Sequence, residues 1–122
     1  STDVCLPISN ITECVNFAEE QAKKFGLRAP MVGHLGDGNF HVLLPFDPEK
    51  KEMYKKIREF NDLLIKKALE LNGTITGEHG VGLHKKEYLL EEHPDNIPLM
   101  KLIKRSIDQN NIMNPGKIFD LN

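Results

Sequence analysis

Apolar and polar positions alternate at the start of the chain, and this period of two predicts a β-strand over residues 3–8. Two further β-prone segments, residues 29–35 and 39–46, flank an Asp-Gly pair. A last short β-prone stretch covers residues 74–76. The apolar face of the first strand would hold Val4, Leu6 and Ile8.

A first long segment instead repeats apolar residues at helical spacing, which predicts a helix. Asn10 is expected to cap this helix, with Glu13 as its capping-box partner, and Gly26 is expected to end it. Its apolar stripe contains Ile11, Cys14, Val15, Ala18, Ala22 and Phe25.

The second long helix is expected to begin with Asp47 as its cap and Pro48 at its first position, and to end at Asn72 and Gly73. Shorter helices are predicted over residues 85–92 and 97–110. The stripe of the long helix contains Met53, Ile57, Phe60, Leu64, Ala68 and Leu71. That of the last helix contains Leu99, Leu102, Ile103 and Ile107.

This order of elements predicts an α+β fold, a ferredoxin-like βαββαβ antiparallel sheet with two helices on one face and extra C-terminal helices. The other sheet face would be left uncovered. Because that face would expose Val32 and Leu43, we expect a partner domain to cover it.

The pair Asp37 and Gly38 predicts a two-residue hairpin turn of type I′. Such a turn would place His34 directly opposite His41, on one face and with their Cβ atoms close together. The opposite, core face would then hold Met31, Leu35, Phe40, Val42 and Leu44.

Two neighbouring imidazoles can bind one metal ion, and Glu78, inside a Gly-rich loop, is the candidate third ligand. The set His34, His41 and Glu78 suits Zn²⁺, Mn²⁺ or Fe²⁺ and leaves coordination positions open to a substrate. The alternative reading is two surface histidines and a solvated carboxylate.

His79 follows Glu78 directly and is a candidate general base; the alternative is a histidine that only orients a ligand. Asn39 is a candidate substrate contact or simply a turn residue. Lys85 could reach an anionic substrate, although a solvated helix face is the simpler interpretation.

Composition narrows the function classes. The formal net charge is −2 and there is no basic patch with interleaved aromatic residues, so nucleic acid is not an expected partner. No apolar run is long enough to span a membrane. Cys5 and Cys14 fit no zinc motif and are expected to be reduced thiols. The abrupt start without Met suggests a fragment of a longer protein.

Three motifs in the same order resemble one family. They are Gly-His-Leu-Gly-Asp-Gly-Asn-Phe-His at 33–41, Gly-Thr-Ile-Thr-Gly-Glu-His-Gly-Val-Gly at 73–82 followed by Lys85, and Asn-Pro-Gly-Lys at 114–117. The chain resembles, over nearly its whole length, the C-terminal domain of FAD-linked oxidases of the vanillyl-alcohol-oxidase-like superfamily. It is most similar to D-lactate dehydrogenases of the cytochrome type and to glycolate oxidase FAD subunits.

The resemblance implies that the whole of residues 1–122 is the substrate and metal domain of a flavoenzyme. Such enzymes oxidise D-2-hydroxy acids to 2-oxo acids and pass a hydride to FAD, which a separate N-terminal domain mainly holds. The chain alone is therefore expected to be inactive. The family's metal ligands, Zn or Mn being the candidate ions, fall on His34, His41 and Glu78, and its substrate-side histidine falls on His79.

The resemblance also implies that the turn at 114–117 lies near the flavin, with Asn114, Gly116 and Lys117 as cofactor contacts. Leu43 stands where the D-2-hydroxyglutarate branch has a polar asparagine, which favours a small substrate such as lactate. The expected location is the cytoplasm, or the mitochondrion in a eukaryote; the electron acceptor is left open.

Three alternatives stay open from the sequence. One is a D-2-hydroxyglutarate dehydrogenase. Another is a non-catalytic metal-binding module with a ferredoxin-like fold, which needs only the hairpin and its histidines. A non-haem iron oxygenase is suggested by the two-histidine, one-carboxylate set alone.

Overall fold

The computed structural model describes residues 1–47 and 49–121, in two compact units, Ser1–His79 and Gly80–Asn122. The expectation for Pro48 lies outside the described residues. The first unit contains a three-stranded antiparallel sheet with strand order β1-β3-β2. The strands are β1 (Thr2–Cys5), β2 (Met31–His34) and β3 (Asn39–Val42).

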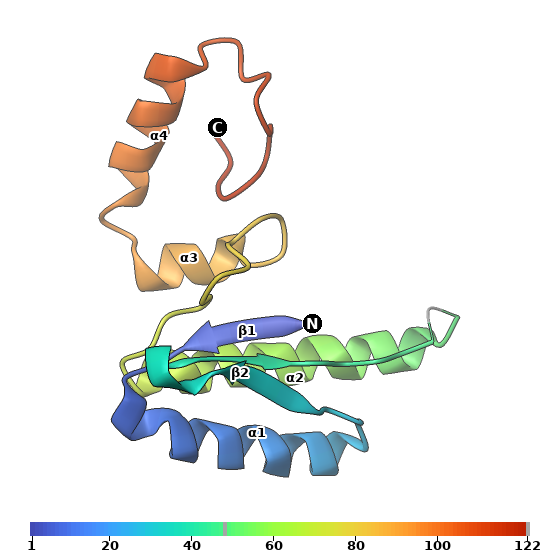
Figure 1. The fold of residues 1–122 in the computed structure, drawn as a ribbon. Helices are drawn as coiled ribbons and strands as arrows, with labels where there is room; N and C mark the ends of the chain where they lie inside the picture. The colour runs from blue at the N-terminus through green and yellow to red at the C-terminus, as the bar shows by residue number, and fades with distance from the viewer. Residues whose placement is uncertain (48, 122) are drawn as a thin grey trace. The chain divides into compact units, whose positions relative to one another are not determined.

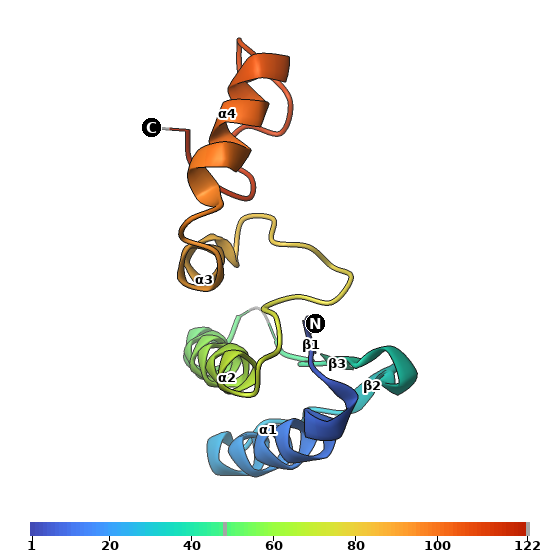
Figure 2. The same cartoon turned by 90° about the vertical axis from the view of Figure 1, so that its left-hand side faces the viewer.

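Two long helices, α1 (Ile11–Phe25) and α2 (Lys51–Glu70), lie on the same face of this sheet (Figures 1 and 2). The predicted α+β fold with both helices on one sheet face is therefore confirmed. The fourth strand expected at 74–76 is reduced to an isolated bridge between Thr74 and Cys5, beside β1.

The core of this unit lies between the sheet and the two helices. Most buried positions of the helices belong to the apolar stripes predicted above; Ile65, also fully buried, was missed. The fully buried thiol of Cys14 has its pKa raised to about 11, chiefly because burial disfavours the thiolate. The core contains Val4, Phe40 and Val42 from the sheet, Cys14, Ala18 and Ala22 from α1, and Phe60, Leu64, Ile65 and Ala68 from α2.

The hairpin differs from the prediction in its turn. A short 3₁₀ turn at Leu35–Asp37, followed by Gly38 at φ 81°, replaces the two-residue turn. His34 therefore pairs with Asn39, and His41 pairs with Val32. Leu35, expected in the core, is in the turn and 52% exposed. The shift is two residues, which equals the side-chain period of a strand, so both histidines keep the predicted face.

Several predicted element boundaries were also wrong: β3 ends at Val42 instead of residue 46, and α2 begins at Lys51. The first strand ends at Cys5, and Ile8, expected on its apolar face, is 64% exposed in a 3₁₀ turn that follows Pro7. Pro7 lacks the amide N–H that a continuing strand would use. The last helix ends at Ile107, three residues before its predicted end at 110.

Asn10 occupies the predicted N-cap position of α1, but neither predicted capping interaction forms, and the N-cap of α2 is Lys50. The Asn10 side chain makes no cap hydrogen bond; its Nδ2 donates to the carbonyl of Leu71 at 2.8 Å, at the end of α2. Glu13 accepts a hydrogen bond from Lys67 at 2.7 Å. Asp47 Oδ1 accepts the Glu49 amide at 3.1 Å in a turn that precedes α2. Long-range partners and a local turn thus replace the expected caps.

Helix α1 ends, as predicted, at Gly26, whose φ is 66°. The segment after α2 also turns where expected, with Asn72 at φ 58° and the Gly73 amide bonded to the Ala68 carbonyl at 2.8 Å.

The second unit contains α3 (Lys86–Glu92) and α4 (Ile97–Ile107). The predicted stripe of α4 is largely exposed within this unit, with Ile107 75% exposed. Among the described residues, no helix combines the length and the apolar character needed to cross a membrane.

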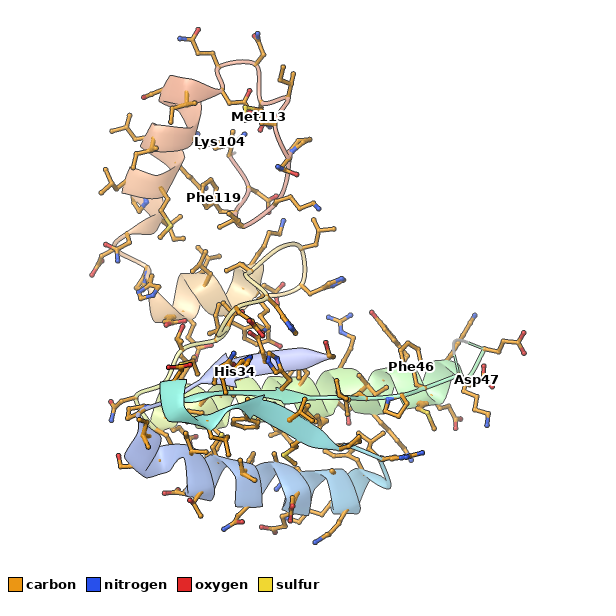
Figure 3. All side chains as sticks on the ribbon, in the orientation of Figure 1. His34, Phe46, Asp47, Lys104, Met113 and Phe119 are labelled. Atoms are coloured by element: carbon orange, nitrogen blue, oxygen red, sulfur yellow. The ribbon has the colours of Figure 1, made fainter. Side chains whose placement is uncertain are left out.

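The turn after α4 depends on Asp108, whose side chain is 4% exposed. Its carboxylate accepts the amides of Ile112 at 3.0 Å and Met113 at 2.9 Å, and it hydrogen-bonds Lys104, which also contacts the Met113 carbonyl (Figure 3). The Lys104 hydrogen bond, followed by the two amides, lowers the pKa of Asp108 below its ordinary 3.8, against the opposing effect of burial.

We therefore expect Asp108 to stabilise the folded state above about pH 4 and to lose this effect as the pH falls through its lowered pKa. Asp108→Asn should lower the Tm at neutral pH, and the difference from the wild type should shrink in acid. Thermal unfolding measured from pH 2 to pH 7 checks this. Asp120→Asn, at an exposed partner of Lys86, is the matched control and should change little. Equal pH profiles for the wild type and Asp108→Asn would contradict the assignment.

Candidate active site on the polar face of the sheet

The sheet face away from the two helices carries the side chains that could do chemistry. Pairing places Asp3 of β1 and Val32 of β2 on either side of His41, and Asn39 next to His34. Successive strand residues alternate between faces, and Phe40 and Val42 point to the core. We call the surface formed by Asp3, Val32, His34, Asn39 and His41 the polar face.

A loop of four residues, 76–79, is fixed to this face by Asp3. One oxygen of Asp3, Oδ2, accepts the amides of Gly77 and Glu78 at 2.7 Å each and of His79 at 3.1 Å. The other oxygen, Oδ1, accepts the Thr76 hydroxyl at 3.0 Å. The carboxylate of Asp3 therefore holds the loop 76–79 beside the edge strand β1.

This arrangement brings three of the predicted site residues together. Nε2 of His41 lies 2.8 Å from Oε1 of Glu78, and the His79 ring stacks on the His41 ring with centroids 4.7 Å apart. The His34 ring, near the end of β2 in Figure 3, is 6.5 Å from that of His41 and edge-on to it. The two histidines are therefore not directly opposite each other as predicted. They are diagonal neighbours on adjacent strands and lie on the same face.

The distance between the His41 and Glu78 donor atoms can be compared with the spacing of two ligands on one divalent cation. Two ligand atoms that bind one ion at about 2.1 Å, with an angle near 90–110° between them, lie about 3.0–3.4 Å apart. The separation of 2.8 Å between the His41 nitrogen and the Glu78 oxygen is shorter than this range and is the distance of a direct hydrogen bond. An imidazole nitrogen and a carboxylate oxygen are also the donors that Zn²⁺ and Mn²⁺ accept.

Asp3, His41 and His79 form a second candidate set, with one ligand atom each within 4.8 Å of one another. The hydrogen bonds from the loop already occupy both oxygens of Asp3, which favours an anchoring role for it over metal binding. Sequence reasoning missed Asp3. The available signal was its alternation with Val4, which puts an acid on the same face as the histidines.

Asn39 lies against the loop. Its side chain is so close to Gly77 that a Cβ at that glycine would be 2.2 Å from Asn39 Oδ1. Within the described part of the chain, Asn39 Oδ1 and His41 Nδ1 are buried side-chain atoms without a hydrogen-bond partner. Unpartnered polar atoms of this kind are costly in a finished core and are common where a ligand binds.

The remaining predicted residues are placed separately. Leu43 follows β3, bonds its amide to the Pro30 carbonyl at 2.9 Å and is 39% exposed. Lys85, in the second unit, is 8% exposed, so the solvated-face interpretation was wrong. The turn at 114–117 has the Lys117 amide 3.3 Å from the Asn114 carbonyl, with Gly116 at φ 72°.

Comparison with known proteins agrees with the motifs. The chain is 42% identical to a probable mitochondrial D-lactate dehydrogenase of Danio rerio, over 99% of this chain and 24% of that protein. It is 40% identical to a mitochondrial D-lactate dehydrogenase [cytochrome] of Arabidopsis thaliana, over 96% of this chain and 21% of that protein. It is 38% identical to glycolate oxidase subunit GlcD of Bacillus subtilis, over 96% of this chain and 25% of that protein.

The chain thus spans about a quarter of the length of the curated relatives it matches. Residues 1–118 match the family described as FAD linked oxidases, C-terminal domain. With the motifs, the α+β sheet and this match in agreement, the chain belongs to the C-terminal domain family of the FAD linked oxidases.

Proposed function

We propose that this chain is the substrate-side domain of a flavin-dependent dehydrogenase that oxidises a D-2-hydroxy acid to the 2-oxo acid. The observation that carries the proposal is the convergence of His41, Glu78 and His79 above one sheet face. Relatives named D-lactate dehydrogenase and glycolate oxidase subunit support this reaction class. A separate FAD-binding domain of the same protein would complete the site.

His34, His41 and Glu78 are the proposed ligands of a divalent cation, Zn or Mn. A bound cation would supply Lewis acidity toward the substrate oxygens, and FAD would accept the hydride. The contact between His41 and Glu78 supports the placing of two of these residues in one site. His34 is included because its ring lies on the same sheet face, 6.5 Å from that of His41.

His79 is the proposed base for the substrate hydroxyl. Its Nδ1 lies 3.7 Å from Asp3 Oδ1, which is too long for a hydrogen bond, so neither ring nitrogen is committed to Asp3 as a donor. The side chain is 42% exposed, which leaves it accessible to a small molecule. Stacking on His41 restricts the orientation of the ring and keeps it beside the proposed cation ligands.

The proposed substrate is small, of the D-lactate or glycolate type. Leu43 directly follows β3, two residues after His41, and an apolar side chain offers no partner to a second carboxylate. Asn39 and Lys85 are the proposed polar substrate contacts.

A D-2-hydroxyglutarate dehydrogenase of Stutzerimonas stutzeri is 43% identical over 71% of this chain and 19% of that protein, so 2-hydroxyglutarate is the second candidate substrate. A screen of D-2-hydroxy acids with the full-length protein and a dye acceptor distinguishes the two candidates.

Asn114, Gly116 and Lys117 are the proposed flavin contacts. Their turn is tight, with left-handed backbone at both Asn114 and Gly116. The proposed location is the cytoplasm, or the mitochondrion if the source is a eukaryote, since the relatives from Danio rerio and Arabidopsis thaliana are named as mitochondrial.

Replacing His79 tests the proposed base. His79→Ala should lower kcat of the full-length enzyme by about 10²- to 10⁴-fold, because a positioned base contributes that much. Steady-state kinetics measure the effect. His84→Ala, in the second unit and outside the proposed site, is the control. A kcat within a few-fold of wild type would remove His79 from this role.

Replacing His41 tests the proposed ligand set. His41→Ala should abolish stoichiometric Zn or Mn binding, because it removes the nitrogen that faces Glu78. Elemental analysis of the purified full-length protein gives the metal content, and His93→Ala is a control outside the proposed ligand set. Unchanged metal content in His41→Ala would refute the ligand assignment.

The close approach of the loop to Asn39 provides a third test. Gly77→Ala would drive a Cβ into the Asn39 side chain and displace the loop at a cost of about 1–3 kcal/mol. We expect a loss of metal affinity and of kcat. Gly36→Ala is the matched control, since a Cβ there meets nothing within 4 Å. Equal metal affinity in the two variants would show that the approach is unimportant.

A further inference from the structure

Asp3 is a buried acid in β1 with 0% of its surface exposed. A buried carboxylate is costly unless hydrogen bonds compensate for the lost hydration. Here the compensation comes from one short loop: the amides of Gly77, Glu78 and His79 on Oδ2 and the hydroxyl of Thr76 on Oδ1. Hydrogen bonds to an ionised oxygen at 2.7 Å belong to the strong, charge-assisted class.

Successive backbone N–H groups that converge on one anion form a concave arrangement that an anion stabilises. The loop at 77–79 has this form, and its anion is a side chain of the same protein. Without a negative oxygen at the point where they converge, the partial positive charges of the three N–H groups would repel one another. The conformation of the loop therefore depends on Asp3.

Asp3 also fixes where the loop lies. In the ladder it is the direct partner of His41, the residue that Glu78 contacts. A single side chain thus connects the loop that carries Glu78 and His79 to the strand that carries His41. Residues more than seventy positions apart in the sequence are placed together through this connection.

We propose that Asp3 is a positioning residue of the active site, which holds Glu78 against His41 and His79 above it. Its importance for catalysis rests on the function proposed above for those residues. Its action on the loop does not, because the hydrogen bonds exist whatever the site binds.

The first experiment measures the loop directly. Asp3→Asn keeps the shape of the side chain but removes its charge. Hydrogen–deuterium exchange of the full-length protein, in peptides that span residues 76–80, should become at least about tenfold faster, since hydrogen bonds to charged groups are the ones lost. Unchanged exchange in a folded Asp3→Asn protein would overturn the proposal.

The control for this experiment is Asp108→Asn. Asp108 is also a buried acid that accepts two consecutive amides, but it lies in the second unit. It should leave exchange in residues 76–80 unchanged while loosening residues 111–114. Equal acceleration of 76–80 in both variants would indicate general destabilisation and would count against a positioning role.

The second experiment measures the consequence for the site. Mn²⁺ titration of the full-length protein should show weaker binding in Asp3→Asn than in Asp108→Asn, and kcat should fall more than KM rises. If the wild type binds no Mn²⁺ or Zn²⁺, the proposed metal function fails, while the exchange data still decide the role of Asp3.

A milder variant covers the case in which Asp3→Asn does not fold. Thr76→Val removes only the hydroxyl that donates to Oδ1. It should give a smaller acceleration in the same peptides and a smaller loss of Mn²⁺ affinity. Wild-type exchange and wild-type affinity in Thr76→Val would then count against the proposal.

Discussion

The alternation of side chains along β3 is the constraint on which this domain depends. Phe40 and Val42 point into the core between the sheet and the two long helices, so the alternate positions, Asn39 and His41, are fixed on the other side. The hydrophobic packing that stabilises the fold thereby also orients the histidine that contacts Glu78. One face of β3 therefore contributes to the hydrophobic core, and the other carries the candidate site residues.

Much of this could be predicted from the sequence because it follows from periodicity. Buried positions such as Phe60, Leu64 and Ala68 repeat at helical spacing, and the sheet residues repeat at a spacing of two. The predicted faces of the strands were correct although the predicted turn was wrong, because a shift of two residues in the pairing leaves each side chain on the same face. The contact of Glu78 with His41 confirmed that the distant Gly-rich loop returns to the hairpin.

What could not be predicted depends on partners far away in the chain. Asn10 has the sequence signature of a cap, but its amide group bonds the carbonyl of Leu71 instead. In the sequence Asp3 is an ordinary polar strand residue, and only the structure shows that it accepts the amides of residues 77–79. No local pattern encodes such contacts. The exposed stripe of α4 has apolar residues at the predicted spacing, yet a stripe by itself does not specify what covers it.

The 3₁₀ turn between β2 and β3 has a consequence for how the hairpin tolerates change. Within residues 1–47 and 49–121, strand β3 pairs with both β1 and β2, whereas β2 is an edge strand that pairs with β3 alone. A residue added to the turn can be accommodated in a longer loop that leaves the pairing of β2 with β3 unchanged. A slip of β2 by one position along β3 would instead carry His34 to the helix side, while His41 stayed in place beside β1. His34 is therefore the histidine whose face depends on the register of an edge strand.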